Sequence, residues 1–311
     1  MHIALIFPGQ GSQSIGMLSE LSTQFPIVTK IFSQASDVLH YDLWDLVQNG
    51  PAEKLDQTEF TQPALLAADI AVWECWKLSG GKNPHFLAGH SLGEYAALVA
   101  AQAIDFNDGI SLVAARGKYM QSAVPDNAGA MAAIVGLEDQ TVIDICQQAS
   151  QAGIVSPANY NSVGQIVIAG EIKAVEKAIL LAEEKGAKIA KKIPVSVPSH
   201  CTLMQPAADK MAEKLKSIHV KAPQIPVIQN ADVKFFDSPD KIKEALIHQL
   251  ISPVRWVETI QYMIDHDIKT FYECGPGKVL AGLNRRISRE VCSKSLHTKS
   301  EIEAAKKNTG E

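Results

Sequence analysis

Residues 87–101 read LAGHSLGEYAALVAA, and they place Ser91 between two glycines directly before an alanine-rich helical run. The short apolar run ahead of the motif predicts a strand, and residues 94–101 predict a helix, so the order is strand, sharp turn and helix. Residues 89–93 fit G-x-S-x-G, an elbow whose tight turn holds a serine hydroxyl clear of the backbone. Backbone N–H groups at the start of the helix would lie beside any anion that forms there. The stretch favours an α/β fold with Ser91 as a nucleophile, and the alternative is that Ser91 only shapes a turn.

Strand-like and helical patterns alternate along much of the remaining chain, which predicts a mostly parallel sheet covered by helices on both faces. The strands are expected at residues 3–7, 85–88, 224–230 and 270–274. The helices are expected at residues 25–47, 63–79, 241–250 and 255–266. An insert is expected between about residues 127 and 195, where shorter units follow the order β-α-β-β-α-β of ferredoxin-like domains.

This pattern divides the chain into three parts. Residues 1–126 and 196–292 are expected to form the large catalytic α/β domain, and residues 127–195 the small domain. The remaining residues, 293–311, are polar and carry almost no core-forming side chains. We therefore expect them to be a solvated or frayed C-terminal tail.

Composition narrows the classes of function. The chain has 311 residues, of which 46% are hydrophobic and 20% charged, as in ordinary globular proteins. Its formal net charge of -5 argues against nucleic acid as the main partner. The five cysteines are scattered without C-x-x-C pairing, which favours reduced thiols over disulfides or a zinc site. With neither a secretory signal nor a membrane span at the amino terminus, we expect a cytoplasmic protein without membrane association. Nothing in the sequence demands more than a monomer.

A serine nucleophile needs a base, and histidine is the usual one near neutral pH. Of nine histidines, His200 is the candidate, because it lies in the proline-flanked segment PVSVPSHC that leaves the predicted insert. Loops at strand ends are where such folds place catalytic groups. The alternative is an ordinary hydrogen-bonded loop histidine. No acid stands out before His200 in the chain, so a backbone carbonyl is the expected orienting acceptor in place of a triad acid.

Two further segments suggest binding groups. Gln10, in the glycine loop FPGQGSQ, could bring an N–H donor to a developing oxyanion, and the loss of one such donor typically costs about 100- to 1,000-fold in rate. Arg116 follows a long apolar helical stretch, where a guanidinium is costly unless it is paired. By position alone a structural salt bridge or a solvent-directed side chain is favoured for Arg116. The alternative is a bidentate clamp for a substrate carboxylate.

Seven segments together resemble one enzyme family. They are, in chain order, FPGQGSQ, TQPAL, GHSLGEYAAL, RGKYMQ, ANYNSVGQIVIAG, VPSH and GPGKVL. Their sequences and order resemble those of malonyl-coenzyme A:acyl carrier protein transacylases over residues 1 to about 285. The resemblance implies an α/β-hydrolase-like domain with an inserted ferredoxin-like domain and an active site in the cleft between them. It departs from the family at Cys274, where an aliphatic residue is common, and in the tail after about residue 292.

The resemblance also implies a role for each matching residue. Ser91 would accept the malonyl group, and His200 would act as its acid and base. Arg116 would bind the malonyl carboxylate, so the resemblance favours the clamp over the structural salt bridge or solvent-directed side chain that position alone favours. Gln10 and the backbone N–H of Leu92 would form the oxyanion hole. The remaining matches are Gln249, whose main-chain carbonyl would orient the histidine, and Gln62, Asn159 and Asn161, which would bind substrate less directly, from around the residues that contact it.

The implied reaction is a ping-pong transfer of malonyl from malonyl-coenzyme A to the phosphopantetheine thiol of an acyl carrier protein, without metal or cofactor. The free-standing chain favours fatty-acid synthesis, and a polyketide pathway remains the alternative. A serine thioesterase that releases the acyl group to water and an inactive carrier-binding scaffold are the other two hypotheses. Acyl carrier proteins are acidic, so basic residues are expected near the cleft mouth, with Lys188, Lys191, Lys192, Arg285 and Arg286 as candidates.

Overall fold

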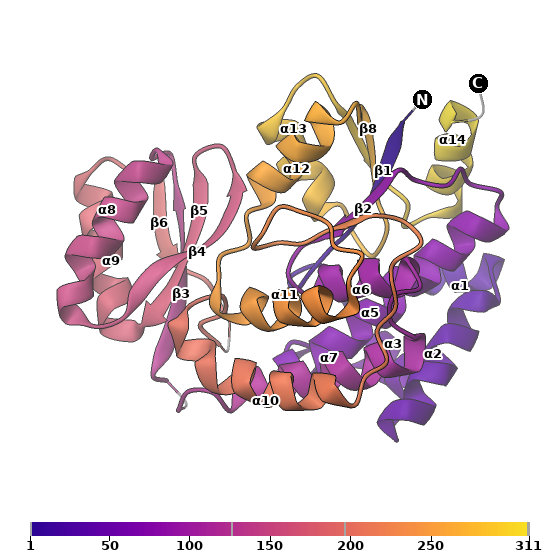
Figure 1. Cartoon of the computed structure of the whole chain (residues 1–311), viewed down its shortest axis with the longest axis horizontal. Helices are drawn as coiled ribbons and strands as arrows, with labels where there is room; N and C mark the ends of the chain where they lie inside the picture. The colour runs from indigo at the N-terminus through magenta and orange to yellow at the C-terminus, as the bar shows by residue number, and fades with distance from the viewer. Residues whose placement is uncertain (1, 126, 196, 310–311) are drawn as a thin grey trace.

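The computed structural model describes residues 2–125, 127–195 and 197–309, and its larger sheet has five parallel strands (Figure 1). Their order is β7-β2-β1-β8-β9. The bounds are Ile3–Phe7 for β1, Phe86–Gly89 for β2, Val227–Ile228 for β7, Thr270–Glu273 for β8 and Cys292–Ser295 for β9. The central strand β1, IALIF, is buried along its whole length, as expected for a parallel sheet covered on both faces.

Helices cover both faces of this sheet. Alternate residues of β1 divide between two hydrophobic clusters, with Leu5 in one and Ile6 in the other. The cluster containing Leu5 is formed mainly with α2, α5, α6, α7, α10 and α11, and the cluster containing Ile6 with α12 and α13. The helices are α1 (Ser19–Gln24), α2 (Ile27–Leu39), α3 (Leu43–Asn49), α4 (Ala52–Leu55), α5 (Thr58–Leu78), α6 (Leu92–Ala100), α7 (Phe106–Gln121), α10 (Gln205–Lys216), α11 (Pro239–Ile251), α12 (Trp256–Asp265), α13 (Val279–Ile287) and α14 (Lys299–Thr309).

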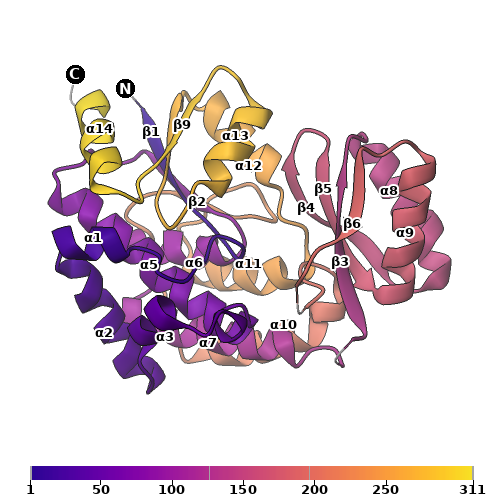
Figure 2. The ribbon, with the colours of Figure 1, turned by 180° about the vertical axis from the view of Figure 1, so that it is seen from behind.

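The smaller sheet has four antiparallel strands in the order β4-β5-β3-β6. Its elements are β3 (Gly129–Val135), α8 (Asp139–Ala149), β4 (Val155–Ser162), β5 (Gln165–Glu171), α9 (Ile172–Glu184) and β6 (Ile189–Lys192). Helices α8 and α9 cover the face that is turned away from the larger sheet (Figures 1 and 2). The predicted fold class, a mostly parallel α/β sheet with a small split β-α-β sheet, is confirmed.

The two sheets meet where β4 runs beside the loop that precedes α12. Tyr160 donates its backbone N–H to Val254, and Val254 donates to Ala158, both at 2.9 Å. The uncovered face of the small sheet packs on Cys201, next to His200. The predicted domain boundaries fall at residues 126 and 196, which lie outside the described residues, so the division of the chain stays a prediction.

The prediction of one helix over residues 25–47 is wrong, because the segment forms two helices, α2 and α3. His40 ends α2 with a left-handed φ of 60°. Asp42 then caps α3, since its carboxylate accepts the backbone N–H of Asp45 at 2.8 Å. The break therefore relies on a histidine in a conformation that usually signals glycine or asparagine.

The prediction of a frayed tail is also wrong. Strand β9 pairs in parallel with β8, and α14 follows it beside the amino-terminal end of β1 (Figure 2). Ile302 and Ala305 of α14 are 0% and 2% exposed within the large core. The phenol of Tyr272 donates to the carbonyl of Ala305 at 3.3 Å. The segment is thus an integral edge of the larger sheet.

Candidate active site

Ser91 stands at the tip of a strained elbow between β2 and α6. Its backbone adopts φ 54° and ψ -108°, a sparsely populated region for a residue other than glycine. The flanking glycines are required by packing, because a Cβ at Gly89 would collide with the backbone of Gly93, and one at Gly93 with that of Phe7. The sequence G-x-S-x-G therefore lets three backbone segments approach closely and leaves the serine hydroxyl at the start of a helix.

His200 lies within hydrogen-bonding distance of Ser91. Its Nε2 is 2.7 Å from Ser91 Oγ, and its Nδ1 is 2.9 Å from the backbone carbonyl oxygen of Gln249. The carbonyl can only accept, so Nδ1 carries the proton and Nε2 is left free to accept the serine proton. The imidazole is 3% exposed. Burial, assisted by the nearby charge of Arg116, lowers the pKa of His200 to about 3, which keeps the ring neutral at pH 7 with Nε2 unprotonated.

Arg116, on α7, is a buried cation surrounded by neutral partners. It is 1% exposed, and its two terminal nitrogens donate to Gln62 Oε1 at 2.9 Å, Gln249 Oε1 at 2.8 Å and Ser91 Oγ at 3.2 Å. Its guanidinium lies 5.2 Å from the ring centre of Tyr95. Among the described residues no ion pair involves Arg116, and its Nε has no hydrogen-bond partner. The structural salt bridge favoured from position alone is therefore not found.

Two residues carry the N–H donors that were predicted for an oxyanion hole, Leu92 and Gln10. The backbone N–H of Leu92 belongs to the first turn of α6, where a helical N–H lacks an acceptor within its own helix. Gln10 lies in the loop after β1, and its amide Nε2 donates to the hydroxyl of Thr58 at 3.3 Å. Both residues line the same cavity as Ser91. A helix amino terminus and a side-chain amide are suitable donors to a developing negative charge.

A cavity of about 110 Å³ unites these groups between the two sheets. It is smaller than the roughly 300–1,000 Å³ of sites for drug-sized ligands, so it suits a small acyl group. The predicted site residues that line it are Gln10, Gln62, Ser91, Leu92, Arg116, Asn159 and His200. Apolar side chains complete its wall from α7, β3 and the loop after β6, namely Met120, Met131, Ile193, Val195 and Val197. An apolar wall of this kind disfavours water beside the serine.

Two of the predicted site residues do not line the cavity. Gln249 lies behind it, where its side chain donates to the carbonyl of Ser91 at 2.9 Å. Asn161 is linked to the site through His90, because its Oδ1 is 2.8 Å from His90 Nε2. The His90 ring also packs against Trp256, with 5.6 Å between the ring centres. The pair of Asn161 and His90 thus connects the small sheet to the elbow.

Sequence reasoning missed two buried polar residues at the elbow, Asn230 and Glu94. The side chain of Asn230 accepts the backbone N–H of Ser91 at 2.7 Å. The carboxylate of Glu94 accepts the backbone N–H of Asn230 at 2.7 Å. The position of Asn230 at the end of a strand could have identified it, since polar groups at the carboxyl ends of parallel strands often belong to binding or active sites.

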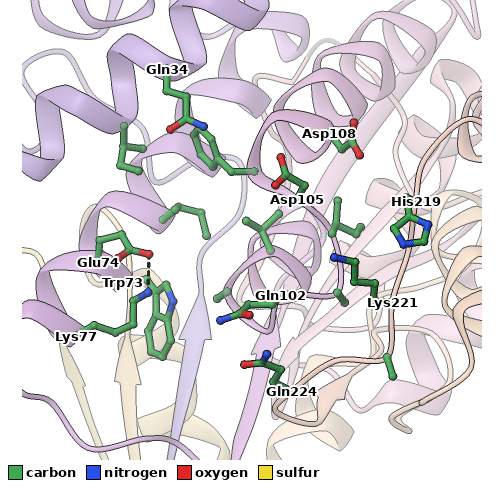
Figure 3. Close-up of a pocket in the computed structure, with 18 residues that line it drawn as sticks. Gln34, Trp73, Glu74, Lys77, Gln102, Asp105, Asp108, His219, Lys221 and Gln224 are labelled. Carbon is green, nitrogen blue, oxygen red and sulfur yellow. Dashed lines mark ion pairs between the residues drawn. The ribbon is translucent and has the colours of Figure 1, made fainter.

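A larger cavity of about 610 Å³ lies elsewhere, among α2, α5, the start of α7 and the segment 219–224 (Figure 3). Its labelled side chains carry charges of both signs, and Lys77 pairs there with Glu74 at 2.7 Å. Among the described residues that line it there is neither a serine nor a cysteine, and none of the predicted site residues. Of these two cavities, the one at Ser91 is lined by the predicted site residues.

Two searches of the described residues set limits on other kinds of site. No group of three or more histidine, cysteine, aspartate or glutamate side chains there could hold a metal ion. No helix in the described ranges is both long enough and apolar enough to cross a membrane.

A family model and individual relatives both match nearly the whole chain. A family model described as an acyl transferase domain matches residues 4–306. The malonyl CoA-acyl carrier protein transacylase of Escherichia coli strain K12 is 51% identical over 304 residues, which are 98% of each protein. The match extends beyond residue 292, so the expectation that the tail lies outside the resemblance is wrong.

Two solved structures are similar in fold and sequence. That of the malonyl CoA-acyl carrier protein transacylase of Coxiella burnetii has a TM-score of 0.99 at 53% identity and covers 100% of this chain and 98% of its own. A type II polyketide acyl carrier protein in complex with its malonyl-transacylase gives a TM-score of 0.98 at 50% identity, over 99% of this chain and 100% of the other.

Proposed function

The chain belongs to the family of malonyl CoA-acyl carrier protein transacylases, which are acyltransferases, and we propose that it transfers malonyl from malonyl-coenzyme A to the phosphopantetheine thiol of an acyl carrier protein. One observation carries the proposal. The buried guanidinium of Arg116 lies beside the Ser91–His200 pair, and among the described residues its hydrogen bonds go to neutral acceptors. A buried cation without a counter-charge favours a ligand that brings a carboxylate, as malonyl does and acetyl does not.

The first half-reaction forms a malonyl ester on Ser91. His200 Nε2 takes the hydroxyl proton while Ser91 Oγ attacks the thioester carbonyl carbon. The Leu92 N–H and the Gln10 amide donate to the oxyanion of the tetrahedral intermediate. When the intermediate collapses, the C–S bond breaks, and coenzyme A leaves as a thiol with the proton that His200 returns.

The second half-reaction runs the same steps backwards with the carrier thiol. His200 takes the thiol proton, the sulfur attacks the serine ester, and Ser91 regains its proton as the ester bond breaks. One thioester replaces another, so the free energy changes little and the main requirement is to exclude water from the ester. The small cavity, its apolar wall and the fixed position of Arg116 support that requirement.

The proposal is tested by incubating the protein with malonyl-coenzyme A and a holo acyl carrier protein. We expect malonyl on the carrier, and a malonyl adduct on Ser91 by mass spectrometry when the carrier is left out. Ser91→Ala is the matched control and should give neither product. Free malonate as the main product would instead identify a thioesterase, and the absence of any adduct on the wild type would identify a scaffold.

The identity of the carrier is part of the proposal. We assign the enzyme to fatty-acid synthesis, but similarity alone does not separate the pathways, because a malonyl-transacylase solved with a polyketide carrier is 50% identical and an Escherichia coli relative is 51% identical. Transfer rates to a fatty-acid carrier and to a polyketide carrier, measured side by side, distinguish them. A preference for the polyketide carrier would overturn the assignment.

Basic residues are proposed to receive the acidic carrier. All five candidates are exposed, with Lys191 and Lys192 on the edge strand β6, Lys188 just before it, and Arg285 and Arg286 on α13. Two of them have neighbours already, since Lys192 pairs with Glu176 and Arg286 donates to Gln165. Charge reversal at these positions should raise the KM for the carrier and leave the KM for malonyl-coenzyme A unchanged. Transfer that is insensitive to salt and to these changes would exclude the surface.

A cytoplasmic location is also proposed. All five cysteines are free thiols, four of them buried, as is typical of proteins from reducing compartments.

A further inference from the structure

Asn230 lies two residues beyond the end of β7, and its side chain spans the elbow. The side chain is 1% exposed. Its Oδ1 accepts the backbone N–H of Ser91 at 2.7 Å, and its Nδ2 donates to the carbonyl oxygen of Gly89 at 2.6 Å. One amide group therefore holds the backbone on both sides of His90, at the place where the strand turns into the helix.

This contact continues the ladder between β2 and β7 after the backbone pairing ends. The two strands pair at Leu87 with Val227 and at Ala88 with Ile228. The pairing with β7 ends at Ala88, and after Gly89, the last residue of β2, the chain turns sharply into the elbow. The carboxamide of Asn230 offers one acceptor and one donor, as a peptide group does. An aspartate would offer acceptors only, and leucine, of similar size, would offer neither.

The strained backbone of Ser91 requires such support. Its φ of 54° and ψ of -108° persist only where surrounding contacts determine them. The carbonyl of Ser91 accepts the backbone N–H of Glu94 and the side-chain amide of Gln249. Its N–H is held by Asn230. The backbone N–H and the carbonyl of Ser91 are therefore both fixed in direction. Together they fix the direction in which the side chain leaves the backbone.

Asn230 is itself held in place from two directions. Its backbone N–H donates to Glu94 Oε2 at 2.7 Å, and its carbonyl accepts the backbone N–H of Arg255 at 3.1 Å. Glu94 is 0% exposed and lies one turn after Ser91 on α6. Burial raises the pKa of Glu94 to about 8, so a neutral carboxyl accepts this N–H at pH 7.

We propose that Asn230 is a positioning residue for the nucleophile: its amide clamps the backbone around Ser91 so that Oγ stays within reach of His200, and Glu94 fixes the clamp. The proposal rests on the proposed function of Ser91. It deepens that function, because neither Asn230 nor Glu94 is among the residues that line the cavity. Loss of the clamp therefore reduces the rate of serine acylation and leaves the binding of malonyl-coenzyme A nearly unchanged.

The test measures malonyl-Ser91 formation by rapid quench at a series of malonyl-coenzyme A concentrations. Asn230→Asp keeps an acceptor for the Ser91 N–H but places an oxygen against the Gly89 carbonyl. We expect the rate at saturation to fall about 10- to 100-fold, with the half-saturating concentration within about 3-fold of the wild type. A wild-type rate for Asn230→Asp overturns the proposal, and so does a rise in the half-saturating concentration that accounts for the whole loss.

Asn284→Asp is the matched control for a loss of stability alone. Asn284 is 0% exposed, accepts from Trp256 Nε1 at 3.0 Å and donates to Ser293 Oγ at 3.4 Å. The same exchange of donor for oxygen thus occurs in the core away from the cavity. We expect Asn284→Asp to lower the melting temperature while the acylation rate stays within about 2-fold. An equal loss of rate in both variants would assign Asn230 a general structural role.

A second pair of variants keeps the proposal testable if Asn230→Asp does not fold. Glu94→Met removes the acceptor for the Asn230 N–H and should lower the acylation rate, whereas Glu94→Gln keeps the acceptor and should rescue most of it. Equal losses of acylation rate in Glu94→Met and Glu94→Gln would show that the hydrogen bond from Asn230 is not what matters, and would overturn the role of Glu94 in the clamp. If the wild-type protein forms no malonyl-Ser91, the proposed function itself is refuted. If the wild type is acylated and these variants are acylated at the same rate, only the role of Asn230 and Glu94 is refuted.

Discussion

The backbone carbonyl oxygen of Gln249 accepts a hydrogen bond from His200 at 2.9 Å, while the side chain of the same residue binds Arg116 and the carbonyl of Ser91. One residue therefore orients the base through its main chain and supports the cation through its amide. The first contact remains in any substitution that preserves the backbone, so the two contributions can be separated by experiment.

Gln249→Ala should lower malonyl transfer about 10-fold without changing its pH dependence, because His200 keeps its acceptor while Arg116 and the Ser91 carbonyl each lose a partner. Steady-state rates over a range of pH test this. His200→Ala, which removes the base, is the comparison and should abolish the burst of malonyl-Ser91. If Gln249→Ala lost as much transfer activity as His200→Ala, the main-chain and side-chain contributions of Gln249 would not be separable as proposed.

Arg116→Ala should reduce malonyl transfer at least about 10- to 100-fold, because charge-assisted hydrogen bonds to the malonyl carboxylate are lost. Acetyl-coenzyme A is the internal control, since acetyl has no carboxylate and its transfer should change much less. The rate of malonyl transfer by Arg116→Lys should lie between those of the wild type and Arg116→Ala, because lysine keeps the charge but not the planar fork. Equal losses for malonyl and acetyl would exclude the clamp.

The acylation rate should not show the inflection of an ordinary histidine near pH 6.5. The pKa of His200 is lowered to about 3 by burial and by the charge of Arg116, so the free enzyme keeps a neutral base down to about pH 5. The measurement is kcat/KM for malonyl-coenzyme A between pH 5 and 8, which reports the free enzyme. Arg116→Ala removes the positive neighbour and should move any acidic inflection to higher pH. A wild-type inflection at 6.5 would contradict the burial argument.

Glu94→Gln should become more stable relative to the wild type as the pH rises from about 5 to about 8. The pKa of Glu94 is raised to about 8 in the fold, whereas an unfolded glutamate ionises near 4.5, so across that window the unfolded wild type has already lost this proton while the folded protein still holds it. The glutamine keeps the acceptor for Asn230 and has no proton to release. Melting temperatures of the two proteins at several pH values test this. A difference that stays constant with pH would show that Glu94 does not titrate in this range.

Ile302→Ala should destabilise the protein by about 2–5 kcal/mol, because a fully buried side chain of α14 leaves a cavity in the large core. Glu303→Ala, at the neighbouring exposed position on the same helix, is the matched control and should change stability by no more than about 0.5 kcal/mol. Denaturant unfolding measures both. Equal stability of Ile302→Ala and the wild type would mean that α14 does not dock on the sheet in solution.

The limits of the sequence are clearest in the last strand and helix. β9 turns polar residues toward the molecule, with Ser293 and Ser295 at 6% and 7% exposure, and α14 has few fully buried apolar residues, among them Ile302. A segment with so few apolar positions carries little periodic signal. Its order comes from backbone pairing with the edge of β8, which a reading of local pattern does not detect.

Local chemistry determined the elbow, the alternation of strands and helices and the split unit of residues 129–192, because turn sterics and hydrophobic periodicity act over a few residues. Local motifs also named four site candidates, Ser91, His200, Gln10 and Arg116, and the family resemblance added the other five. Only the tertiary structure decided the distances between them. Ser91 lies 109 residues from His200 and 139 from Asn230, and the two packed sheets bring all three into one buried network. Burial in that network makes His200 neutral, and among the described residues Arg116 has no ion-pair partner there. Both properties depend on neighbours that no local stretch of sequence contains.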